Sequence, residues 1–228
     1  IGPFTPPAGA SKGGGMGMGG GTKSAQLLEA LDWATAENKR PDSKYYQKAN
    51  PSQFAAMGMS CGGLQAMEVS PDPRVTTSVI MNSGVLNTPM GAPKEGAQKI
   101  GLPQGGEPKP GAPQRKAPLM GMPVVGKDIL QRLHAPVLYV IGGEKDIAYP
   151  NAMDDFAKID SVPVAIANLD VGHGGTYNQP NGGEFGKVAV AWLKWKAKGD
   201  AAAGKMFSGP DCGLCGDANW KLEKKKIP

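Results

Sequence analysis

The chain has 228 residues, enough for one domain with a sizeable core and too few to make two full-size domains the default. It carries 25 basic and 20 acidic side chains, but only 6% of its residues are aromatic, and no basic face interleaved with aromatics suggests a nucleic-acid partner. No apolar run approaches the roughly 20 residues that cross a bilayer. We therefore expect one soluble domain that binds neither nucleic acid nor membrane.

Glycine and proline are unevenly spread along the chain. The 34 Gly and 21 Pro residues concentrate in residues 6–22 and 88–126. In residues 1–22, proline and glycine interrupt any helical or strand spacing of apolar residues, so this segment is predicted to be irregular. Residues 88–126 are longer than most structureless loops, which are usually functional lids or disordered links. This Pro/Gly-rich insertion is predicted to be either a lid over the end of the domain that carries the active site or an irregular surface loop.

Between these segments, helical and strand patterns alternate. An amphipathic helix is predicted from Ser24 onward, with Leu27, Leu28, Leu31 and Ala34 at helical spacing and Thr22 or Ser24 as its cap. Short apolar runs predict four strands, and helical periods predict four further helices. The strands are expected within residues 53–59, 74–84, 136–143 and 162–169, and the helices within residues 61–70, 127–133, 151–159 and 183–199.

Near-continuous apolar strands that alternate with helices are typical of a mostly parallel sheet with helices on both faces. The predicted fold class is therefore α/β, as a single domain over residues 1–228. The basic run "KLEKKK" at residues 221–226 is predicted to be a solvated tail.

A Gly-x-Ser-x-Gly pattern occurs twice, around Ser11 and around Ser60. Ser11 has no strand before it and a glycine run in place of a helix after it, so we interpret this match as accidental. Ser60 stands between a predicted strand and a predicted helix. A serine on such a sharp turn projects its hydroxyl above the carboxyl edge of the sheet, and small neighbours at Gly58 and Gly62 would let the turn close. Ser60 is the candidate nucleophile.

A serine hydroxyl needs a base, usually a histidine held by a carboxylate. The chain has two histidines. His134 precedes a predicted strand, at the opposite end of the sheet from Ser60, whereas His173 follows a strand at its carboxyl end. His173 is therefore the predicted base.

Carboxylates follow the third predicted strand at the same edge. Asp146 is preferred as the partner of the histidine, with Glu144 as the fallback and Asp170 as a weaker candidate. The chain order Ser60, Asp146, His173 is the nucleophile, acid, base order of the α/β-hydrolase fold.

Two of the three cysteines lie close together near the end of the chain. Cys212 and Cys215 in "DCGLC" predict a local disulfide, which suits an exported protein. A zinc site would need two more ligands nearby, and none is in view. We expect no metal and no cofactor.

The stretches "GMSCGGLQA", "YVIGGEKDIAYPNA", "VGHGGTY" and "MFSGPDCGLCGDANWKLEKKK" resemble a secreted α/β-hydrolase family near the dienelactone-hydrolase and polyester-hydrolase-like esterases. The resemblance implies hydrolysis of a small or polymeric carboxylic ester through an acyl-enzyme. It also implies one oxyanion donor at the backbone N–H of Cys61. The Cys61 thiol itself is expected to face the core as an inert side chain.

The sequence departs from this family at its front, where the N-terminal strands of the fold are missing. We expect the strand before Ser60 to expose an apolar edge, and one oxyanion donor to be lost. Activity would then depend on a companion chain or segment that supplies the missing strands. Two alternatives remain open: a non-catalytic binding or assembly protein on a truncated hydrolase scaffold, and an acyltransferase that uses the same residues.

Overall fold

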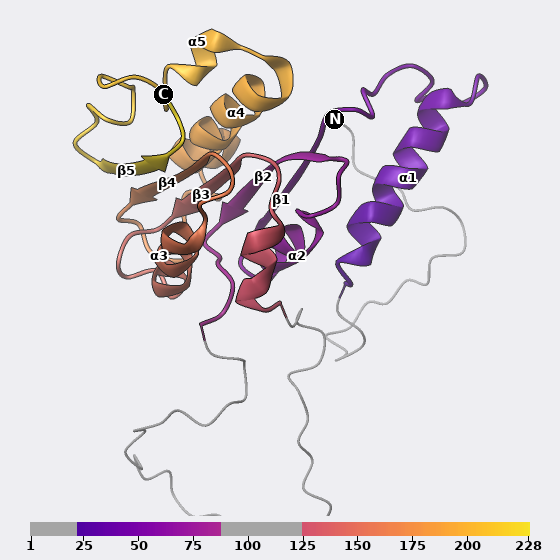
Figure 1. Ribbon diagram of the computed structural model, residues 1–228. Coiled ribbons are helices and arrows are strands. Elements are labelled where there is room, and N and C mark those ends of the chain that lie inside the picture. The colour runs from indigo at the N-terminus through magenta and orange to yellow at the C-terminus, as the bar shows by residue number, and fades with distance from the viewer. Residues whose placement is uncertain (1–21, 88–124) are drawn as a thin grey trace, which may run out of the picture.

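A computed structural model describes residues 22–87 and 125–228 of the chain (Figure 1). Ser11 and nearly all of the Pro/Gly-rich insertion at residues 88–126 lie outside the described residues. The interpretation of both therefore stays a prediction.

The described residues form one five-stranded sheet in the order β1-β2-β3-β4-β5. The first four strands are parallel, and β5 pairs antiparallel with β4. The first four strands form at the predicted apolar runs, whose residues can be buried against helices. The strand β3 is buried along its whole length. The strands are β1 (Phe54–Met59), β2 (Val75–Met81), β3 (Val137–Ile141), β4 (Val164–Leu169) and β5 (Trp220–Lys225).

Helices cover both faces of this sheet, as Figure 1 shows. One core lies between the sheet and α2 and α3, and the other lies between the sheet and α4. This arrangement confirms the predicted α/β class. The helices are α1 (Ala25–Lys39), α2 (Cys61–Val69), α3 (Tyr149–Lys158), α4 (Gly183–Lys198) and α5 (Ala201–Gly204), with two 3-10 helices, η1 (Lys127–Arg132) and η2 (Pro180–Gly182).

Two local details of the helices differ from the sequence analysis. The segment that begins at Lys127 forms a 3-10 helix that ends at Arg132, and residues 133–136 connect it to β3. Ser24 occupies the N-cap position of α1 without a side-chain cap, because its hydroxyl bonds Glu68 on α2. Thr22 likewise bonds Gln65 on α2. These contacts bind the start of α1 to its neighbour.

The prediction of a solvated tail at residues 221–226 is wrong, because these residues form most of β5 and its end. The open edge of β4 supplies backbone partners for this polar segment, from Val164 paired with Lys225 to Leu169 paired with Trp220. The lysines of β5 then find carbonyl oxygens. Lys225 donates to the carbonyls of Ala157 and Ile159 at the end of α3, where a cation also complements the helix dipole.

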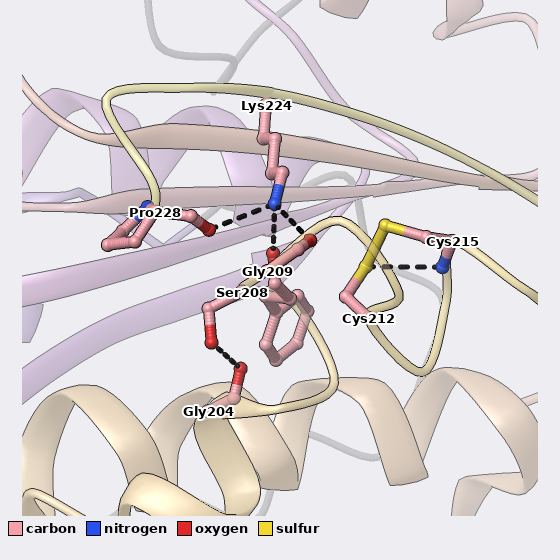
Figure 2. The surroundings of a disulfide bond; sticks show 8 residues. Gly204, Ser208, Gly209, Cys212, Cys215, Lys224 and Pro228 are labelled. Atoms are coloured by element: carbon pink, nitrogen blue, oxygen red, sulfur yellow. Dashed lines mark hydrogen bonds between the residues drawn. A yellow bond between two sulfur atoms is a disulfide. The ribbon is translucent and has the colours of Figure 1, made fainter.

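Lys224 has a similar role at the end of the chain. Its ammonium group donates to the carbonyl oxygens of Phe207, Gly209 and Pro228, at 3.1, 3.0 and 3.0 Å (Figure 2). The same view shows the Cys212–Cys215 disulfide beside this cluster. The C-terminal segment is thus held to the loop after α5 by charge-assisted hydrogen bonds.

The other edge of the sheet is β1. Within residues 22–87 and 125–228, β1 pairs only with β2. Met57 and Met59 on β1 are 44% and 36% exposed. The expectation of an apolar edge on the strand before Ser60 therefore agrees with the part of the chain that the structure describes.

Candidate active site

Ser60 lies on the turn that joins β1 to α2. Its backbone has φ 54° and ψ −119°, a conformation that a non-glycine residue rarely adopts. Two hydrogen bonds hold it there: the Ser60 amide donates to the carbonyl of Met81 at 3.0 Å, and the Ser83 hydroxyl donates to the carbonyl of Ser60 at 2.8 Å. A strained serine between a strand and a helix is the geometry that the sequence pattern predicted.

Of the two glycines that the pattern places around this turn, Gly58 has the predicted role and Gly62 does not. A side chain at Gly58 would approach within 2.2 Å of the carbonyl oxygen of Gly62, so only glycine fits there. A side chain at Gly62 would meet nothing within 4 Å. The second position that requires glycine is Gly63, where a side chain would approach within 2.4 Å of Ser83. The prediction that Gly62 lets the turn close is wrong, because a side chain there would have open space, whereas Gly63 lies directly against Ser83 after β2.

Asp146 follows β3 and is almost completely buried. Its two carboxylate oxygens accept hydrogen bonds from the amides of Gly142 and Ala148, at 3.0 and 2.9 Å, and from the Asn82 side chain at 2.6 Å. Burial on its own would raise the pKa of Asp146, but these hydrogen bonds and the one from His173 outweigh it and lower the pKa. The carboxylate is therefore held in its charged form.

His173 follows β4 in a loop that packs against the loop carrying Asp146. The amides of Val171 and Gly172 both donate to the carbonyl of Gly142, at 3.1 and 2.7 Å. A side chain at Gly142 would approach within 1.9 Å of the carbonyl oxygen of Gly172, so the two loops meet backbone to backbone. This contact fixes where His173 and Asp146 stand relative to each other.

The structure brings all three predicted residues together. Nδ1 of His173 lies 2.7 Å from Oδ1 of Asp146, and Nε2 of His173 lies 3.1 Å from Oγ of Ser60. Both distances are hydrogen-bond lengths. With the Nδ1–H tautomer, the imidazole donates to the carboxylate and accepts from the serine hydroxyl. This is the arrangement in which a histidine acts as a general base toward a hydroxyl nucleophile.

The other candidates lie elsewhere. Glu144 is exposed, and Asp170 is exposed and lies 3.5 Å from the Lys145 ammonium. Neither bonds His173. His134 is an exposed residue just before β3, at the opposite end of the sheet from the carboxyl edge. The structure thus brings together Ser60, Asp146 and His173 and none of the alternatives.

Two residues of this site were missed. Asn82, directly after β2, is buried with φ 42°, and it both donates to Asp146 and accepts a hydrogen bond from the hydroxyl of Tyr177. Burial raises the pKa of Tyr177 well above its usual value, so its hydroxyl keeps the proton that it donates. The position of Asn82 after a strand, at the same edge as Ser60 and Asp146, is the signal that could have found it.

Cys61 begins α2 immediately after Ser60. Its side chain is a free thiol and is exposed, so the expectation that it faces the core is wrong. Within the described residues the Cys61 amide N–H has no hydrogen-bond acceptor, which leaves it free at the N-terminus of the helix.

Three further findings concern the chemistry available to the chain. Cys212 and Cys215 form a disulfide. In the part of the chain that the structure describes, no group of three or more His, Cys, Asp or Glu side chains could hold a metal ion. None of the helices in residues 22–87 and 125–228 is long and apolar enough to cross a membrane.

Comparisons with protein-family models and with curated proteins find no match to this chain.

Proposed function

We propose that the protein is a serine carboxylic-ester hydrolase. The observation that carries this proposal is the continuous hydrogen-bonded chain from Asp146 through His173 to Ser60. A serine hydroxyl that is hydrogen-bonded to an oriented imidazole, on a strained turn with a free amide beside it, is equipped for acyl transfer.

The proposed reaction has two halves. The Oγ of Ser60 attacks the ester carbonyl carbon while Nε2 of His173 takes the hydroxyl proton. The negative charge that develops on the carbonyl oxygen is stabilised by the Cys61 amide N–H at the start of α2. When the carbon–oxygen bond of the ester breaks, His173 returns the proton to the leaving alcohol and an acyl-enzyme remains on Ser60. Water, deprotonated by His173, then releases the acid and restores the serine.

Asp146 and Asn82 act through the histidine in this scheme. The Asp146 carboxylate fixes the tautomer of His173 and stabilises the imidazolium that forms in each half-reaction. Asn82 holds the carboxylate from its other side.

A fluorophosphonate probe tests the proposal, because it labels only an activated serine. We expect labelling at Ser60, confirmed by peptide mapping, and its loss in His173→Ala. His134→Ala is the matched control, since His134 is exposed and distant from the carboxyl edge, and should label like the wild type. Absence of labelling in the intact protein would support the non-catalytic binding protein instead.

Acyl transfer to an alcohol uses the same residues and differs only in the acceptor. Hydrolysis in the presence of an added alcohol separates the two reactions. We expect the free acid as the main product. A predominance of the transesterified product would identify an acyltransferase.

We also propose that the protein works outside the cytosol, because the Cys212–Cys215 disulfide suits an oxidising compartment. Alkylation and mass spectrometry of native material should find one free thiol, at Cys61. Three alkylated cysteines would argue against this location.

Finally, we propose that the outer edge of β1 is covered in the active protein, by a companion chain or by a segment outside the described residues. The exposed Met57 and Met59 on an edge strand support this, since such edges promote aggregation. Native material should show slow hydrogen exchange at the outward-facing amides of β1. Exchange at the rate of an open edge would overturn it.

A further inference from the structure

The side-chain amide of Asn82, directly after β2, has partners on both its nitrogen and its oxygen. Its Nδ2 donates to Oδ2 of Asp146 at 2.6 Å and to the carbonyl of Gly172 at 3.4 Å. A carboxylate and a carbonyl oxygen can only accept, so the nitrogen must face both of them. The oxygen of the amide then faces the opposite way, where the hydroxyl of Tyr177 donates to it.

Tyr177 is the first donor of a chain with a fixed direction. Burial and the negative charge of Asp146 raise the pKa of Tyr177 above its usual value, so the hydroxyl is neutral and donates. Asn82 passes this polarity on to Oδ2 of Asp146, while His173 donates to Oδ1. Two series of hydrogen bonds thus end on the two oxygens of one carboxylate, and bonds in such series strengthen one another.

Tyr177 also belongs to the loop that carries His173. The loop follows β4, and the two residues are four positions apart. The hydrogen bonds and this stretch of backbone therefore form a closed ring through Asp146, His173, Tyr177 and Asn82. The ring joins the ends of β2, β3 and β4. His173 is thus held directly through its side chain and indirectly through its loop.

The aromatic ring of Tyr177 is itself fixed by packing. It meets Phe185 of α4 edge-on, with ring centroids 5.6 Å apart and an angle of 88° between the planes. A side chain at Gly175 would approach within 2.7 Å of the Tyr177 ring, so the ring lies directly on the backbone of its own loop. The hydroxyl is therefore presented from a ring that has little freedom to move, as a supporting contact of a reactive site requires.

We propose that Tyr177 is a positioning residue for the hydrolysis proposed above: its hydroxyl fixes the Asn82 amide, and that amide holds the carboxylate and the histidine loop in place. This inference rests on the proposed function. In the scheme given there Tyr177 touches no reacting atom, so its effect reaches Ser60 only through the residues between them. Small misplacements of a reacting group are costly to turnover, which is why a remote hydroxyl affects the rate.

Tyr177→Phe tests the proposal, because it removes the hydroxyl and keeps the ring against Phe185. We expect kcat for a p-nitrophenyl ester to fall about tenfold, the effect of one lost hydrogen bond. KM should change by less than about twofold, since substrate binding is not affected. Tyr149→Phe, the same change at another half-buried tyrosine, is the matched control and should leave kcat unaltered.

A second variant tests whether the effect passes through Asn82. Asn82→Gly removes the amide, and glycine readily adopts the φ of 42° found there. When Tyr177→Phe is added to Asn82→Gly, we expect little further loss of kcat, because the two residues act in one series. Losses that multiply in the double variant would show that Tyr177 acts by another route and would overturn the proposal.

The Nδ1 proton of His173, followed by NMR, supplies a measurement that needs no substrate. Its bond to Asp146 should protect it from exchange with water in the wild type and in Tyr149→Phe. We expect faster exchange in Tyr177→Phe, because the carboxylate is held less firmly.

Unchanged kcat together with unchanged exchange in Tyr177→Phe would overturn the proposal. A raised KM with unaltered kcat would also overturn it, because it would assign Tyr177 to substrate binding. If the wild type hydrolyses no ester, the proposed function fails by itself. The exchange of the His173 proton then decides whether Tyr177 positions the pair.

Discussion

The carboxyl edge of the sheet and the region of α4 with the loop after α5 are held by different forces. At the carboxyl edge, hydrogen bonds and unusual backbone angles set the positions of polar groups, as with Ser60 at φ 54° and Asn82 at φ 42°. In the region of α4 and the loop after α5, aromatic packing dominates: Trp192 lies 5.1 Å from Phe207 and 5.6 Å from Trp195, measured between ring centroids. The first region places reacting atoms, and the second contributes stability. Substitutions at the carboxyl edge should therefore change turnover most, and substitutions in the second region should change the free energy of unfolding most.

The largest expected effect tests the carboxyl edge. Asp146→Asn keeps the shape of the side chain but favours the wrong tautomer of His173, and we expect ester hydrolysis to fall about 10⁴-fold. Turnover of a p-nitrophenyl ester measures this. The new amide nitrogen would face hydrogen-bond donors, so the midpoint of urea unfolding should fall as well, and turnover is compared on the folded variant. Unaltered turnover of the folded variant would contradict the assigned role.

Trp192→Ala tests the opposite region. Trp192 is fully buried between the sheet and the loop after α5, and its indole N–H donates to Thr77 at 2.8 Å. Truncation should lower the free energy of unfolding by about 3–5 kcal/mol. Val190→Ala on the same helix is the control, since Val190 is 51% exposed, and should change it by less than about 0.5 kcal/mol. Equal effects of the two changes would contradict the packing described for α4.

Asp155 is a buried polar residue near the carboxyl edge that also affects stability. This buried carboxylate accepts from the amide of Val85, the hydroxyl of Tyr139 and the ammonium of Lys127. Burial raises its pKa to about 6, and these three bonds only partly oppose that shift. The folded state then binds the proton more tightly than the unfolded state.

The sign of the pH effect follows from that difference. Between about pH 4 and pH 6 the contribution of Asp155 to stability falls as pH rises, by about 3 kcal/mol in all. The free energy of unfolding of the wild type relative to Asp155→Asn should thus be larger at pH 4 than at pH 7. The pKa of Asp154 is lowered by its bonds to Lys127 and Lys158, so Asp154→Asn should show the opposite trend. A pH-independent difference for Asp155→Asn would refute this account.

The smallest effect concerns the disulfide. It closes a loop of only four residues, from Cys212 to Cys215, so the restriction that it places on the unfolded chain is worth about 2 kcal/mol. Changing both cysteines to serine should lower the free energy of unfolding by this amount and leave labelling of Ser60 intact. Cys61→Ser is the control for loss of a thiol. Loss of labelling in the double variant would show that the two regions are coupled.

Most of the site could be predicted from the sequence, because Ser60, Asp146 and His173 each follow a strand at the same edge of the sheet. Four parallel strands were recognisable from apolar runs bounded by glycine, proline or aspartate, and Ser60, Asp146 and His173 each follow one of them. Parallel strands present their carboxyl ends together, so the convergence of these residues could be foreseen. Asn82 was overlooked because an asparagine after a strand is also a common turn residue.

The α/β class, the parallel strands and the chain order of the three site residues can be read from the amino-acid sequence, because local apolar periods and turn residues encode them. The three-dimensional fold was needed to recognise residues 220–225 as an edge strand, since the open edge of β4 and the carbonyls at the end of α3 stabilise it. It also decided that Gly63 and not Gly62 must be small, and that Asn168 is left with an unpaired oxygen. These features depend on contacts between distant segments, which no local pattern contains.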